Sequence, residues 1–169
     1  MKRSALLLVF TIFFMSNSFA QYEEDVKSID SIIKALYASI SGDAGVERDW
    51  DRFKNLFMQG ALLTPTFQNQ EGKVSFIQWT PEEYVETAGA SLVRDGFHED
   101  EISREVDTFR YITQVFSTYQ SKRTKDGEVF ARGINSIQLF NDGSRWWVVS
   151  VFWSAENDDF PIPKKYIKN

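Results

Sequence analysis

The sequence predicts an α+β domain in which helices pack on one face of a curled antiparallel sheet. Two observations carry this prediction. Apolar residues recur at helical spacing in the first half of the chain after residue 20, whereas the second half consists of runs rich in β-branched and aromatic residues. Tight turns separate these later runs, so the strands are expected to pair as a meander rather than through helical crossovers.

The expected helices cover residues 23–41, 49–58 and 81–94. The first has a single apolar stripe, and Gly42 follows it where a left-handed capping glycine is expected. Gly60 ends the second. The third has the clearest start, because Thr80 is placed to cap it, Pro81 takes its first helical position and Glu83 bonds back to the cap.

The expected strands cover residues 61–67, 74–79, 97–106, 109–122, 128–140 and 145–154. The segments 125–127 and 141–144 have the composition of hairpin turns. In the last run both alternating faces are apolar: Trp146, Val148, Ser150 and Phe152 form one, and Trp147, Val149, Val151 and Trp153 form the other. The helices cover only one face of the sheet, so something else must cover the other.

The domain organisation begins with a predicted signal peptide at residues 1–20. A basic start, Lys2-Arg3, is followed by an apolar run that is shorter than the ~20 residues of a spanning helix, and small residues Ser18 and Ala20 precede the expected cleavage point. The alternative is a membrane anchor. Residues 21–155 are expected to form the folded domain and residues 156–169 an extended tail, and the protein is expected in the periplasm or outside the cell.

The composition excludes several classes of partner. Nineteen basic residues stand against 24 acidic ones, a net charge of −5, which disfavours nucleic acids and anionic membrane surfaces. The chain has no cysteine, so no disulfide forms even though export would allow one. His98 is the one histidine, and no metal site and no cofactor are expected because a metal site needs several convergent ligands.

Several segments resemble the nuclear transport factor 2-like superfamily, which includes the SnoaL-like polyketide cyclases and the ketosteroid isomerases. These segments are Asp49–Phe53, Gly60-Ala61, Ser117–Tyr119, Arg132–Leu139, Arg145–Trp147 and Pro161–Tyr166. The later ones are similar to an exported bacterial branch without assigned activity. The resemblance implies a cone-shaped fold, with three helices over a strongly curved sheet and a pocket at the open end. It also implies a homodimer as the common assembly.

The resemblance gives only weak catalytic candidates: Tyr37, His98 and Tyr119. Tyr37 lies on the first helix, where the isomerases carry a tyrosine, but residues 61–67, where their general base is expected, contain no acid. His98 is a conceivable base or metal ligand, yet it stands at the start of a strand among acidic residues. No catalytic residue is therefore assigned.

Aromatic and small polar residues of the strands are the candidates for binding a ligand. The predicted ligand-binding residues are Trp146, Phe152, Ser150, Asn135, Tyr119 and Tyr84. The resemblance implies that Trp146, Val148, Ser150 and Phe152 look into the cone. The polar residues of 130–140 fit either face of the sheet, because a shift of one residue at the 141–144 turn exchanges the two faces.

The leading hypothesis is an exported domain that binds a small apolar or amphipathic molecule without catalysis. One alternative is an acid–base enzyme (an isomerase, cyclase or hydratase) acting in the same pocket. The other is a protein-interaction module that uses the outer sheet face. A homodimer is expected through that face, at Trp147 and Trp153, with the C-terminal tail as a competing cover.

Cleavage of the leader is the first testable prediction. The exported protein should begin at Gln21, because Ser18 and Ala20 suit the −3 and −1 positions of the peptidase. N-terminal sequencing of the exported protein checks this, and a mature product that retains residues 1–15 would contradict it.

Overall fold

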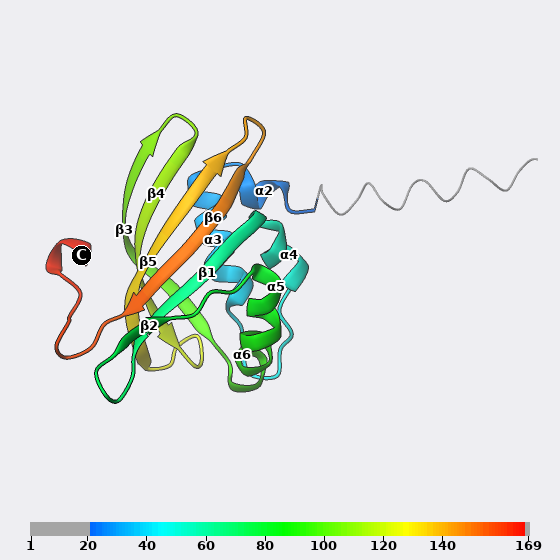
Figure 1. Cartoon of the computed structure of the whole chain (residues 1–169). Coiled ribbons are helices and arrows are strands. Elements are labelled where there is room, and N and C mark those ends of the chain that lie inside the picture. Colours follow the sequence, from blue (N-terminus) through cyan, green and yellow to red (C-terminus); the bar gives the residue numbers. More distant parts are fainter. Residues whose placement is uncertain (1–20, 168–169) are drawn as a thin grey trace, which may run out of the picture.

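The computed structural model describes residues 21–167, and the predicted signal peptide lies outside these residues. Figure 1 shows one body of helices and strands with an extended C-terminal tail. The helical elements are α2 (Glu23–Val26), α3 (Ile29–Ile40), α4 (Trp50–Asn55), α5 (Pro81–Tyr84), a π-helical turn (Val85–Gly89), α6 (Ala90–Asp95) and a 3₁₀ turn (Lys164–Tyr166). The strands are β1 (Phe57–Gln68), β2 (Val74–Phe76), β3 (His98–Phe109), β4 (Ile112–Lys122), β5 (Val129–Asn141) and β6 (Trp146–Ala155).

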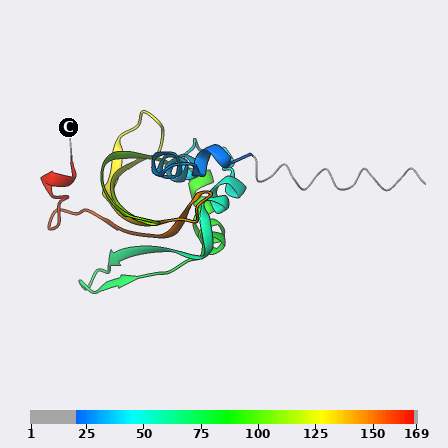
Figure 2. The same ribbon diagram turned by 90° about the horizontal axis from the view of Figure 1, so that it is seen from above.

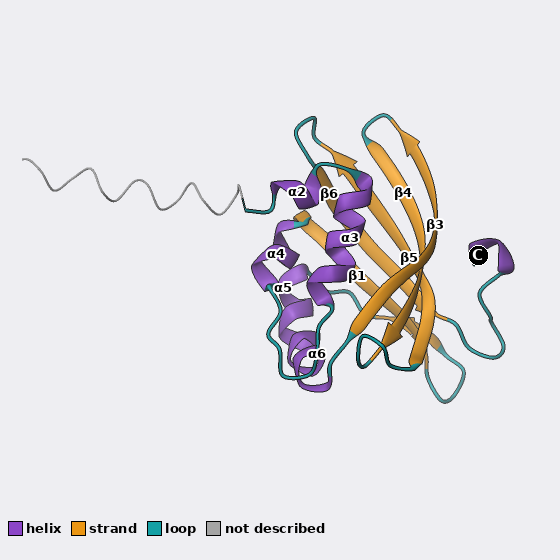
Figure 3. Ribbon diagram, turned by 180° about the vertical axis from the view of Figure 1, so that it is seen from behind, coloured by secondary structure: helices purple, strands orange, loops and turns teal. Residues whose placement is uncertain are grey.

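The six strands form one strongly curved sheet in the order β2-β1-β6-β5-β4-β3. Strands β3 to β6 are the expected antiparallel meander, whereas β1 pairs in parallel with β6. Seen from above, the sheet curls around helix α3, and the tail lies outside the curve (Figure 2). Figure 3 shows the helices gathered on the concave side. The predicted α+β class, with helices on one face of a curved sheet, is therefore confirmed.

The first predicted helix, residues 23–41, is divided in two. Ser28 stops α2 and caps α3: its hydroxyl accepts a hydrogen bond from the backbone N–H of Ser31, and the Ser31 hydroxyl accepts one from the Ser28 N–H. The prediction of Gly42 as a left-handed cap was wrong. Helix α3 ends at Ile40, its C-cap Ser41 is extended, and Gly42 instead forms a β-bridge with Phe97.

The predicted helix start at Thr80 is confirmed. The Glu83 N–H donates to the Thr80 hydroxyl at 3.2 Å, and the Thr80 N–H donates to the Glu83 carboxylate at 2.8 Å. The helix continues through the π-helical turn into α6. The second helix is shorter than expected: Gly60 does not end it but lies within β1, with a φ of 82°, where the pairing with β6 is irregular.

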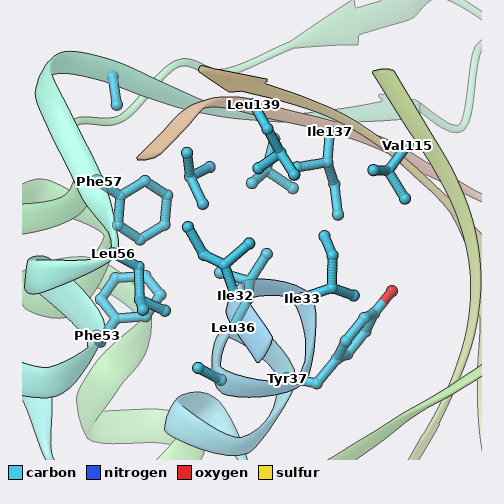
Figure 4. Packing of buried hydrophobic residues seen from close by; sticks show 14 of the residues in the cluster. Ile32, Ile33, Leu36, Tyr37, Phe53, Leu56, Phe57, Val115, Ile137 and Leu139 are labelled. Carbon is cyan, nitrogen blue, oxygen red and sulfur yellow. The ribbon is translucent and has the colours of Figure 1, made fainter. Parts of the chain in front are cut away.

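Helix α3 fills the centre of the curved sheet with its apolar face. Ile32 and Ile33 are completely buried against strand residues such as Val115, Ile137 and Leu139 (Figure 4). Phe53 of α4 closes this core from the side and stacks with Tyr84 of α5 at a centroid distance of 5.4 Å. Because these side chains are packed around α3, most of the cone is a hydrophobic core rather than an open cavity.

A β-bulge in β6 changes which side chains face the core. Leu139 pairs with Val148 but the preceding Gln138 pairs with Ser150, so Val149 is an extra residue in the strand. The expected inward orientation of Ser150 and Phe152 was therefore wrong. Trp146 and Val148 do face inward, but beyond the bulge the inward residues are Val151 and Trp153. The expected outward orientation of Trp153 was wrong for the same reason.

Arg48 holds the loop between α3 and α4 to the helices. Its side chain is buried, with 7% of the residue's surface exposed, and donates to the backbone carbonyls of Ile40, Gly42 and Leu92. Further hydrogen bonds go to the carbonyls of Asp43 and Val46. One guanidinium group thus satisfies backbone acceptors from α3, the loop and α6.

Replacement of the Arg48 guanidinium should destabilise the protein. We expect Arg48→Met to lower the free energy of unfolding by about 2–3 kcal/mol, because buried carbonyls lose charged donors. Arg94→Met, at an exposed ion pair with Asp95, is the matched control and should leave the denaturation midpoint unchanged. Urea denaturation followed by circular dichroism measures both, and equal midpoints for the two variants would contradict the anchoring role.

Candidate functional site

A small pocket remains on the concave side of the sheet, between α3, α4, α5 and the strands. Its volume is about 60 Å³, and most of its walls are apolar side chains such as Leu36, Phe53 and Trp153. Four polar side chains converge on it, each from a different element: Tyr37, Tyr84, Glu99 and Asn135. We call this site the inner pocket. Apolar walls with a few convergent polar groups are the usual form of a small-molecule site.

Glu99 is the ionisable group of the inner pocket. It lies on β3 opposite Ser121 of β4, and the Ser121 hydroxyl donates to its carboxylate at 3.0 Å. Burial raises the pKa of Glu99 to about 7, although hydrogen bonds from Ser121 and Asn135 lower the pKa in part. This carboxyl group therefore changes its charge near neutral pH, far above the range of an exposed glutamate.

A chain of hydrogen bonds runs beside Glu99. The Asn135 amide donates to the Tyr37 hydroxyl at 3.0 Å, and the Tyr37 and Ser117 hydroxyl oxygens lie 2.7 Å apart. Ser117 donates to the Glu101 carboxylate at 2.5 Å, so its oxygen is free to accept the Tyr37 proton. Burial, and then the charge of Glu99, raise the pKa of Tyr37, so this phenol stays protonated.

Two further tyrosines border this chain. The pKa of Tyr84 is raised by burial and by the charge of Glu99, and within residues 21–167 no partner accepts or donates a hydrogen bond at its hydroxyl. The pKa of Tyr119 is raised by the same two causes. Tyr119 lies against Gly133 of β5, where an added Cβ would come within 2.5 Å of the phenol oxygen, so glycine is required there.

The structure brings together some of the predicted ligand-binding residues and separates others. Asn135 and Tyr84 line the inner pocket, and Tyr119 is buried on the same face. Trp146 packs against the core at the other end of β6. Ser150 and Phe152 lie on the outer face of the sheet, where 49% of Phe152 is exposed.

The catalytic candidates divide in the same way. Tyr37 takes part in the buried chain of hydrogen bonds, whereas His98 lies outside the pocket with its Nε2 2.8 Å from the Asp43 carboxylate. Across residues 21–167, no three histidine, aspartate or glutamate side chains are grouped as a metal site requires. In the same range, none of the helices combines the length and hydrophobicity needed to cross a bilayer.

Glu99 is the residue that the sequence analysis did not assign to the pocket. Its signal was present in the alternation of Phe97, Glu99 and Glu101 along one strand, since alternate residues share a face. The adjacent acids Asp100 and Glu101 mask this signal, because a run of acidic residues is typical of an exposed segment. Only the pairing of Glu99 with Ser121, which faces the core, shows that this carboxyl points inward.

No family model matches the sequence, and no curated protein matches it. Solved structures do. A protein of unknown function with a cystatin-like fold from Nostoc punctiforme aligns with a TM-score of 0.57 and 12% identity, over 77% of this chain and 90% of that one. A proposed ketosteroid isomerase from Parabacteroides distasonis aligns with a TM-score of 0.51 and 12% identity, over 80% and 98%.

A third similar structure belongs to the nuclear transport factor 2-like family. A proposed dehydratase from the nuclear transport factor 2-like family of Streptomyces avermitilis aligns with a TM-score of 0.51 and 10% identity, over 73% of this chain and 90% of that one. The three similarities establish the fold. The chain thus has the nuclear transport factor 2-like cone, as its sequence motifs predicted.

The stability of the protein should depend on the ionisation of Glu99. A raised pKa means that the folded state binds a proton more tightly than the unfolded state, so this contribution is complete below pH 4.5 and is lost as the pH rises to about 7. We expect Glu99→Gln, which stays neutral, to remove that loss and to be more stable than the unsubstituted protein at pH 8, by up to about 3 kcal/mol.

Urea denaturation at a series of pH values from 4 to 9 measures this difference. Glu82→Gln, at an exposed position of α5, is the matched control and should follow the unsubstituted protein at every pH. If Glu99→Gln also follows it, the carboxyl group is not held in the environment described here.

Proposed function

We propose that the protein binds a small molecule at the inner pocket and that it does so without catalysing a reaction. The observation that supports this function best is the convergence of Glu99, Asn135 and Tyr84 within otherwise apolar walls. Each comes from a different element, so the arrangement belongs to the folded cone and not to one local motif.

The volume and the polar groups define the kind of ligand. A space of about 60 Å³ admits a small polar group but not an aromatic ring, so the body of the ligand lies at the pocket mouth. Below pH 7 the Glu99 carboxyl donates a hydrogen bond, and the Tyr84 hydroxyl donates or accepts one. A carbonyl, amide or hydroxyl group on an apolar body meets these requirements.

An acid–base enzyme is the second candidate, because Glu99 has the property that such catalysis needs. A carboxyl group with a pKa of about 7 both gives and accepts a proton near neutrality. Two structures of the same fold are described as a proposed ketosteroid isomerase and a proposed dehydratase. For this chain the same pocket would serve, with Glu99 as the proton-transferring group in place of an acid on β1.

The setting of this site is also part of the proposal. The predicted leader would deliver the domain to the periplasm or beyond the cell, where its ligand would be met. Association of two copies through the outer sheet face stays a prediction, but Trp153 does not take part in it because its side chain faces the core. Trp147, the other residue proposed for it, already has partners in its own chain, since its indole N–H donates to Asp142 and the Arg145 guanidinium lies 3.6 Å from its ring centroid.

Ligand binding should depend on the free hydroxyl of Tyr84. A thermal-shift screen of small ketones, amides and alcohols at pH 6 is expected to yield compounds that raise the melting temperature. Tyr84→Phe keeps the ring and removes the hydroxyl, so it should weaken binding about three- to tenfold, in line with one hydrogen bond of about 0.5–1.5 kcal/mol. Tyr22→Phe, near the protein surface, should bind as before.

The same compounds distinguish the two candidate functions. Incubation with the protein followed by mass spectrometry or NMR should recover each compound unchanged. If the protein converts a compound and Glu99→Gln abolishes this conversion, the protein is an enzyme and the purely binding function is wrong. A screen without any stabilising compound would contradict both functions of the inner pocket.

A further inference from the structure

A larger groove lies on the other side of the sheet, between its convex face and the C-terminal tail. Its volume is about 350 Å³. Its floor is the outward side chains Phe116 of β4, Ile134 of β5 and Phe152 of β6, and its roof is formed by Phe160, Ile162 and Pro163 of the tail. We call this site the outer groove.

The tail is fastened to the sheet on both sides of the groove. At one end the Glu156 carboxylate accepts hydrogen bonds from the Arg132 guanidinium at 2.5 Å and from the Ile162 backbone N–H at 3.0 Å. At the other end the Thr118 hydroxyl donates to the Tyr166 carbonyl at 2.7 Å, and the Tyr166 ring packs on Phe116 with a centroid distance of 5.0 Å. Thr118 is completely buried by this contact.

Between these two attachments the tail leaves part of the sheet face uncovered. Pro161 and Pro163 each fix a backbone φ in this part of the tail, and Ile162 between them is buried, with 8% of its surface exposed. Two large apolar side chains remain exposed here: 49% of Phe152 on the sheet and 71% of Phe160 on the tail. Apolar walls held apart in this way form a site that a ligand fills at no cost in chain rearrangement.

We propose that the outer groove binds an uncharged small molecule with an apolar body, such as an aromatic compound or a fatty alcohol. Charge complementarity supports this occupant. Glu156 is the one charged residue of the lining, and it is already paired with Arg132, so no free charge awaits an ionic ligand. Among residues 21–167 nothing hydrogen-bonds to the hydroxyls of Ser136 and Ser154, which leaves two neutral polar groups to orient the ligand.

The size of the groove favours a small molecule over a second protein chain. A volume of about 350 Å³ lies within the range of small-molecule sites. A stable protein interface needs about 800 Å² from each partner. The tail projects over the floor, so a flat protein surface of that size does not reach it. The groove lies on the opposite face of the sheet from the inner pocket, and Trp153 is the one lining residue that the two sites share.

A fluorescence titration with N-phenylnaphthylamine, a neutral apolar probe, tests this proposal on the purified protein. We expect saturable binding, and we expect Phe152→Ala to raise the Kd at least tenfold because it removes an aromatic wall of the site. Phe109→Ala is the matched control: Phe109 is 73% exposed but lies outside the groove, so the Kd should stay within twofold. Circular dichroism of each variant verifies the fold.

Two competitors and one further variant complete the test. Decanol should displace the probe at least ten times more effectively than decanoate at pH 8, because the carboxylate would remain unpaired in the groove. Glu99→Gln should leave the Kd of the probe unchanged, which separates this site from the inner pocket. Equal weakening by Phe152→Ala and Phe109→Ala would overturn the proposal, since it would indicate unspecific adsorption.

Light scattering tests whether a second copy of the chain occupies the groove instead. If the protein is a dimer that does not bind the probe, and Phe152→Ala makes it a monomer, the groove is an interface with a second copy of the chain. This result would overturn the small-molecule site. A protein whose mass is unaffected by Phe152→Ala, while the variant loses the probe, would support it.

Discussion

The packing of helix α3 into the curve of the sheet is the contact on which the rest of the structure depends. Ile32 and Ile33 are completely buried there, and each large aliphatic side chain removed from water in this way contributes on the order of 2 kcal/mol. One turn later the same helix face carries Tyr37, whose hydroxyl points away from the apolar side chains (Figure 4). The helix that builds the core therefore also places the first polar group of the inner pocket.

This polar group requires partners, and the strands supply them. A buried hydroxyl or amide without a hydrogen bond costs on the order of 1–3 kcal/mol, which explains why Tyr37, Ser117 and Asn135 are connected to one another. Glu99 also has hydrogen-bond partners, Ser121 and Asn135, but its burial still favours the neutral form of the carboxyl group. A buried carboxyl group with a raised pKa in a pocket is a candidate for a functional role.

The sheet thus presents two different environments on its two faces. The concave face combines a tightly packed core with a small pocket that contains an ionisable carboxyl group. The convex face is apolar at Phe116, Ile134 and Phe152, and the tail bridges it without filling the space beneath. Helices cover the concave face, whereas the tail covers the convex face only in part and leaves 49% of Phe152 exposed.

The sequence by itself determined the elements whose signals are local. The capping box at Thr80, the hairpin turns and the alternation of the strands each depend on neighbouring residues, and together they were sufficient for the fold class. The tertiary structure decided the facing of Phe152 and Trp153, because the bulge at Val149 depends on the pairing with β5. It also decided the inward position of Glu99, since cross-strand register is set by contacts between segments that are distant in the chain.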